Sequence, residues 1–178
     1  MNFDRDKFKA LVQYICWRCD DPTKLGSTKL NKVLWRSDMQ AYYWFGEPVT
    51  GAKYVNRQHG PVPTAILPVL GELSNEGVLA IREVDHYGLP KREFFALKQP
   101  ALTRFSPDEI SLIDQSIDYV CHKHTARSIS EETHDDIWKL AEIGEEIPYA
   151  TVFAAQLGEI TEDDIAWAKH ELAELTLQ

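Results

Sequence analysis

Residues 27–46 read STKLNKVLWRSDMQAYYWFG. Apolar residues recur in this stretch at intervals of three and four, the spacing of an α-helix that buries one face. Ser27 is a suitable N-cap, and Gly46 suits the position just past a helix C-terminus. The stretch therefore predicts a helix that is capped by Ser27 and runs to Phe45, whose buried stripe comprises Leu30, Val33, Leu34, Ala41 and Phe45.

A mixed face of aromatic, amide and carboxylate side chains runs beside this stripe and comprises Asn31, Trp35, Asp38 and Tyr42. Lys29 and Lys32 fall in the first turns, where a cation opposes the helix dipole at a cost of a few tenths of a kcal/mol each. We expect some feature of the fold to compensate for them. Two interpretations stay open: a binding surface, or a half-buried core edge whose lysines pair with local acids.

Further helices are predicted on both sides of this one. The first, at residues 4–19, places Phe8, Leu11, Val12, Ile15, Cys16 and Cys19 on one face. A strong signal for the start of another helix lies at Ser106-Pro107-Asp108-Glu109, which combines a capping Ser, Pro at the first helical position and carboxylates in the first turn. The other expected helices are residues 64–76, 128–133, 135–143, one after Pro148 and a last one from Thr161 to Leu175; the Ser106 helix should reach about His122.

Strand formers gather in two short runs, residues 78–84 and 92–97, which predict a β-hairpin around a loop at residues 85–90. Residues 48–63 contain the turn signals Thr50-Gly51 and His59-Gly60-Pro61, and predict an extended segment with tight turns. A hairpin of two strands alone is only marginally stable in water, so this one should pack on helices or recruit the Tyr54 segment as a third strand. The predicted fold is mainly α with a small β-hairpin or a three-stranded β element: one compact helical α+β domain over residues 1–178.

The length and composition of the chain are those of a globular protein. With 178 residues, 44% hydrophobic and 26% charged, the chain can fold as one globular domain without disulfides or metals. The N-terminus has no signal-like apolar segment and no apolar run is long enough to span a bilayer, so we expect a cytoplasmic protein with no membrane partner. Three cysteines, an odd number, fit a reducing compartment.

Charge is unevenly distributed. The formal net charge is −9, which disfavours non-specific nucleic-acid binding. Residues 1–104 carry 15 Lys and Arg against 11 Asp and Glu, whereas residues 105–178 carry 4 against 17. The acidic third is either the solvated face of surface helices or a surface for a basic partner, which would gain association rate and selectivity from it.

Two groups of residues have metal-ligand character. Cys16-Trp17-Arg18-Cys19 has the spacing of zinc and redox sites, with Cys121, His122 and His124 as further conceivable ligands. Both N-terminal cysteines also lie on the apolar stripe, where a free Cys acts as a small hydrophobe. His134-Asp135 resembles the doublet of metal phosphohydrolases, with His122 and Asp163 or Asp164 to complete it, but a helix start is the favoured explanation of the doublet. Other catalytic signatures are absent, so we predict no enzyme activity, no metal and no cofactor.

Several short motifs follow one another along the chain. The helical motif at residues 29–35 is followed by an aromatic run at 38–46, a glycine turn and Tyr segment at 49–54, and the turn His59-Gly60-Pro61-Val62-Pro63. Two further motifs lie at residues 105–109 and 129–138. Taken in this order, the motifs resemble those of the Panacea domain of SocA-like antitoxins, and the resemblance covers roughly residues 5–155.

This resemblance implies an antitoxin that binds and inactivates a cognate toxin encoded by a neighbouring gene, with a protease as a further partner in one relative. Some members are phage-associated and have no known toxin. The candidate partner-binding residues are Lys29, Asn31, Lys32, Trp35, Asp38, Tyr54, His59, Gly60, Pro61, His134 and Trp138. The main alternative is a winged-helix nucleic-acid module with Arg82, Lys91 and Arg92 on its wing, and the second is the phosphohydrolase.

Overall fold

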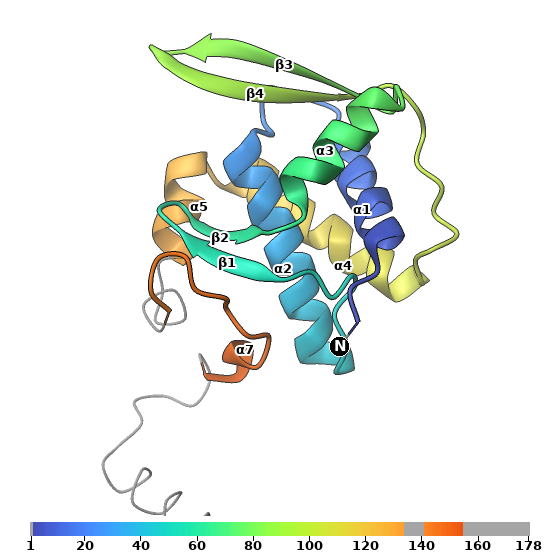
Figure 1. The fold of residues 1–178 in the computed structure, drawn as a ribbon, viewed down its shortest axis with the longest axis vertical. Helices are drawn as coiled ribbons and strands as arrows, with labels where there is room; N and C mark the ends of the chain where they lie inside the picture. The colour runs from blue at the N-terminus through green and yellow to red at the C-terminus, as the bar shows by residue number, and fades with distance from the viewer. Residues whose placement is uncertain (1, 134–140, 155–178) are drawn as a thin grey trace, which may run out of the picture.

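The computed structural model describes residues 2–133 and 141–154 (Figure 1). Its elements confirm a mainly helical α+β fold. In chain order they are α1 (Arg5–Arg18), α2 (Ser27–Phe45), β1 (Tyr54–Arg57), β2 (Gly60–Pro63), α3 (Ile66–Asn75), β3 (Leu79–His86), β4 (Leu89–Ala96), α4 (Pro107–Ile117), the π-helical turn η1 (Asp118–Lys123), α5 (Ala126–Thr133) and α7 (Thr151–Ala154).

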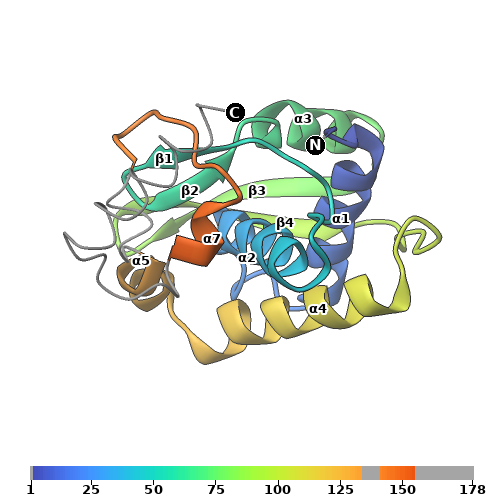
Figure 2. The same cartoon turned by 90° about the horizontal axis from the view of Figure 1, so that it is seen from below.

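Helix α2 runs through the middle of the molecule. Figure 2 shows it with α1, α4 and the β1–β2 hairpin on different sides, and it also contacts α5, η1, α7 and β4. Ten of its nineteen residues are buried, and they cover most of the helix circumference from Lys29 to Ala41. The predicted stripe is therefore buried as expected except at Phe45, which is 51% exposed because the helix end extends beyond the core.

Two separate antiparallel hairpins replace the predicted single β element. Pairing in β3–β4 continues to His86 opposite Leu89, so the connection is only Tyr87-Gly88 and not the whole of residues 85–90. Both connecting residues have positive φ, 55° and 81°, as a two-residue hairpin turn requires. Of the two arrangements expected for this hairpin, packing on helices is the one observed, since β4 contacts α1 and β3 contacts α3. The Tyr54 segment does not join it, because β1 pairs with β2 instead.

The free edge of β1 is covered by a distant segment. Asn56 N donates to Glu145 O at 2.8 Å, Gly144 N donates to Asn56 O at 2.8 Å, and Ile147 N donates to Tyr54 O at 2.9 Å. Residues 144–147 thus satisfy the backbone groups that a two-stranded hairpin leaves open. A third segment does support Tyr54, but it comes from the C-terminal part of the chain.

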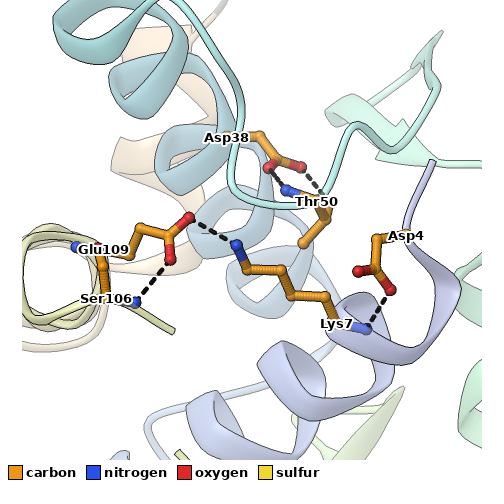
Figure 3. Close-up of polar contacts among 6 residues, drawn as sticks. All are labelled: Asp4, Lys7, Asp38, Thr50, Ser106 and Glu109. Carbon is orange, nitrogen blue, oxygen red and sulfur yellow. Dashed lines mark hydrogen bonds and ion pairs between the residues drawn. The ribbon is translucent and has the colours of Figure 1, made fainter. Parts of the chain in front are cut away.

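Local capping explains several helix boundaries. Asp4 caps α1 by accepting from Lys7 N at 2.8 Å, and Ser106 and Glu109 form a reciprocal capping box at the start of α4 (Figure 3). Helix α2 differs from the prediction, because its N-cap is Gly26 and Ser27 is already the first helical residue. The helix from Ser106 extends about as far as expected, but its last turn is η1, a π-helix.

Some expected features lie outside the described residues: most of the helix at 135–143, the last helix from Thr161 to Leu175, and hence the full extent of the domain. Within residues 2–133 and 141–154, no helix combines the length and apolar character needed to cross a bilayer.

Candidate functional site

Most of the predicted partner-binding side chains lie inside the fold. Lys32, Trp35, Asp38 and Tyr54 are 2%, 8%, 0% and 1% exposed, and Lys29 is buried as well. Side chains this inaccessible cannot contact a partner directly in the folded chain. Of the two interpretations of the mixed face, the structure favours the one in which it belongs to the core.

Asp38 is the hub of a buried hydrogen-bond network. One carboxylate oxygen accepts from Thr50 N at 2.7 Å, and the other accepts from Thr50 Oγ1 and from Tyr54 Oη, both at 2.7 Å (Figure 3 shows the two bonds from Thr50). Three donors converge on one carboxylate, as a buried charge requires. The network fastens the segment before β1 to the middle of α2.

Aromatic rings complete this internal face. The Trp35 and Tyr54 rings meet edge to face with centroids 5.0 Å apart, and Tyr149 lies against Tyr54 at 6.2 Å and Tyr42 at 5.6 Å. The Tyr149 hydroxyl donates to Ala52 O at 2.6 Å. Thus β1 and the segment carrying Tyr149 cover the face that the sequence offered as a docking surface.

Burial raises the pKa of the Asp38 carboxyl above its ordinary value of 3.8, although its hydrogen bonds oppose the shift. Burial also raises the pKa of Tyr54 well above 10.0, so its phenol stays protonated and continues to donate. The folded state therefore holds the Asp38 proton more tightly than the unfolded state does.

This shift predicts a pH dependence of stability. As the pH rises from about 4 through the raised pKa of Asp38, the unfolded chain binds fewer protons than the folded one, so the free energy of unfolding should fall, by at most about 1.4 kcal/mol per pH unit. Urea unfolding of the wild type and of Asp38→Asn at a series of pH values isolates the contribution. A stability difference between the two proteins that stays flat or grows with pH would contradict it.

The two lysines in the first turns of α2 are both buried, and the structure shows how Lys29 is compensated. Its Nζ donates to Cys121 O, in η1, at 3.2 Å. Carbonyls near a helix C-terminus carry the negative end of the helix dipole, so η1 offsets the charge of Lys29. Burial lowers the pKa of Lys29.

A groove opens between the first turns of α2 and the β1–β2 turn, with a volume of about 320 Å³. It brings together three of the predicted residues, Asn31, His59 and Pro61, while Gly60 is buried in the turn beside them. Ser130 Oγ of α5 donates to His59 O at 3.5 Å and so borders this turn. The full lining is Ser27, Thr28, Asn31, Arg57, Gln58, His59, Pro61 and Val62.

Five of these lining residues were missed from the sequence: Ser27, Thr28, Arg57, Gln58 and Val62. They lie within two positions in the chain of residues that were predicted, and that closeness was the one signal available. His134 and Trp138, the two remaining candidates, lie outside the described residues, as does the proposed His134-Asp135 metal doublet.

The cysteines are buried free thiols. A hydrogen bond from Cys121 lowers the pKa of Cys19, whereas burial raises the pKa of Cys16. In the described part of the chain, no three His, Cys, Asp or Glu side chains are grouped so that they could hold a metal ion.

Comparison with known proteins gives one match. The family model described as "Antitoxin SocA-like, Panacea domain" matches residues 30–139, a span from α2 to beyond α5. No curated protein and no solved structure matches the chain.

Proposed function

The chain belongs to the SocA-like antitoxin family with a Panacea domain, and from this we propose that it is an antitoxin that neutralises a cognate toxin by binding it directly. The toxin is encoded by a neighbouring gene, and a protease that receives the complex is a further candidate partner. Neutralisation would be steric and electrostatic masking, without bond chemistry.

The observation that carries this proposal is the family match over α2 and the β1–β2 hairpin, the elements that form the groove. The Asp38 network and the aromatic rings beneath it hold these two elements together. Such a rigid support reduces the ordering cost of binding. We therefore assign the docking surface to the groove, with Asn31, Gln58 and His59 as contacts.

Charge supports a basic toxin. The last third of the chain carries 17 Asp and Glu against 4 Lys and Arg, and an acidic binder attracts a cationic partner before contact. The winged-helix alternative loses support, because the hairpin cations are matched by acids. Arg82 pairs with Glu93 at 2.8 Å and Arg92 with Glu83 at 4.0 Å, which leaves little free charge for phosphates.

Asn31→Arg is expected to abolish protection from the toxin. A long cation placed in the groove blocks the docking surface and repels a basic partner, so the number of surviving colonies on co-expression with the neighbouring gene should fall by about a hundredfold, in line with the loss of a binding hot spot. A pull-down of the toxin by the variant should fail in parallel.

Gln99→Arg is the matched control. It makes the same change of amide to cation at an exposed position in the loop after β4, on the side of the molecule away from the β1–β2 turn (Figures 1 and 2). This variant should protect fully. Protection by a folded Asn31→Arg would move the docking surface elsewhere, and failure of the wild-type protein to bind the neighbouring gene product would refute the antitoxin assignment.

A further inference from the structure

Arg36 is a half-buried cation of α2 whose guanidinium has no acidic partner among the described residues. Its guanidinium lies over the ring of Tyr119, with Cζ 4.1 Å from the ring centroid, and its Nε is buried without a hydrogen-bond partner. Within residues 2–133 and 141–154 it forms no ion pair. Buried charged donors are normally satisfied, so an orphaned one calls for a partner that the isolated chain lacks.

A pocket of about 510 Å³ opens at Arg36, where α1, α2, α4 and η1 meet. Two other cations line it, but each has an acid of its own: Arg18 Nε lies 3.2 Å from Asp114 Oδ1, and Lys123 Nζ lies 3.2 Å from Asp118 Oδ2. With these pairs neutral, the charged lining retains one positive charge, that of Arg36.

The backbone around the pocket is unusual as well. Tyr119, Asp118 and Lys123 all belong to η1, a π-helix of six residues. π-Helical segments are rare and occur frequently at functional sites. The residues that η1 supplies are the ring under Arg36 and one of the two ion pairs, so the unusual backbone and the unmatched charge form one site.

We propose that this pocket receives a carboxylate from an Asp or Glu side chain of the toxin. Arg presents a planar fork of donors that fits a carboxylate, and the single positive charge of the lining matches a monoanion. A phosphate dianion would bring excess charge close to Asp114 and Asp118. The proposal rests on the antitoxin function and adds a second contact, whose lining shares no residue with that of the groove. Figure 2 shows α4, which supplies part of this lining, on another side of α2 than the β1–β2 hairpin.

Arg36→Met tests the pocket. Calorimetric titration of the purified toxin into this variant should show binding at least tenfold weaker than to the wild type, and the salt dependence of binding should decrease. The midpoint of thermal unfolding of the free variant should not fall, because the change removes a buried Nε that has no hydrogen-bond partner. Arg104→Met, the same substitution at an exposed Arg paired with Asp6, should leave binding unchanged.

Exchanging the charges of Arg36 and its toxin partner tests whether Arg36 contacts the toxin directly or only supports the fold. Arg36→Glu should bind the toxin poorly, and one toxin variant with a surface Asp or Glu replaced by Arg should restore the lost affinity. The proposed toxin contact at this pocket is refuted if no toxin variant restores binding, or if Arg36→Met binds the toxin within twofold of the wild type. Either result leaves the antitoxin function intact. A wild-type protein that fails to bind the toxin overturns both.

Titration with small free anions tests whether the pocket binds a toxin side chain or a small-molecule anion. Glutarate and inorganic phosphate, each titrated into the free wild-type protein against chloride of equal ionic strength, should show no saturable binding at millimolar concentration. Saturable binding of glutarate that Arg36→Met abolishes would assign the pocket to a small carboxylate, and saturable binding of phosphate would assign it to a phosphorylated ligand. Either result overturns the toxin contact.

Discussion

Replacing Asp38 with Ala is expected to lower the free energy of unfolding by at least about 3 kcal/mol. The change removes the acceptor of Thr50 N, Thr50 Oγ1 and Tyr54 Oη, and each buried donor left unsatisfied costs roughly 1–3 kcal/mol. Relief of the carboxylate's own burial offsets only part of this loss. Urea unfolding at neutral pH, followed by tryptophan fluorescence, measures the difference.

Asp6→Ala is the control for this substitution. Asp6 is an exposed carboxylate in the first turn of α1 that pairs with Arg104 at 3.2 Å, so its loss should cost less than about 1 kcal/mol. If Asp38→Ala is no more destabilising than Asp6→Ala, the network is not a structural lock, and Asp38 becomes a candidate for direct partner contact again.

Trp35→Ala is expected to destabilise the chain by about 3–5 kcal/mol, because it leaves a large cavity in the core and removes the edge-to-face contact with Tyr54. Protection from the toxin should be lost with it, but through unfolding. Thermal unfolding and the amount of soluble protein, measured beside the protection assay, distinguish this from a lost contact. Trp35→Phe, which keeps a ring in the site, should retain most of the stability and the protection.

Trp44→Ala is the matched control in the same helix. Trp44 is 68% exposed near the end of α2, where a substitution should change the stability by no more than about 0.5 kcal/mol. Equal losses from Trp35→Ala and Trp44→Ala would contradict the burial argument. Full stability of Trp35→Ala together with lost protection would instead place Trp35 in the docking surface.

The two predictions concern the role of the family-like motif in α2. Lys29, Lys32, Trp35 and Asp38 are buried, and Asp38 and Trp35 hold Tyr54 of β1. The motif is therefore better explained as the support of the groove than as its contact surface. Half-buried Asn31 and exposed His59 line the groove itself.

Local signals were enough to predict the long helices of the described residues. The i, i+3, i+4 pattern with Gly46 gave α2 its observed end, and Ser106-Pro107 gave α4 its start, because caps and periodicity act within a few residues. The tight hairpin turn at Tyr87-Gly88 was missed, since a non-glycine residue with positive φ is uncommon there. The segment at residues 144–147, which covers the free edge of β1, was also missed, because it lies about ninety residues away in the chain.

Which face of α2 meets solvent could not be read from the chain. Asn31, Trp35 and Asp38 look like a polar surface, and only the approach of Thr50, Tyr54 and the segment with Tyr149 turns that face inward. The pairing of charges beside Arg36 could not be read from the chain either, since Asp114 of α4 pairs with Arg18 of α1, almost a hundred residues before it. Helix periodicity is a property of neighbouring residues, whereas burial and charge pairing depend on segments that folding brings together.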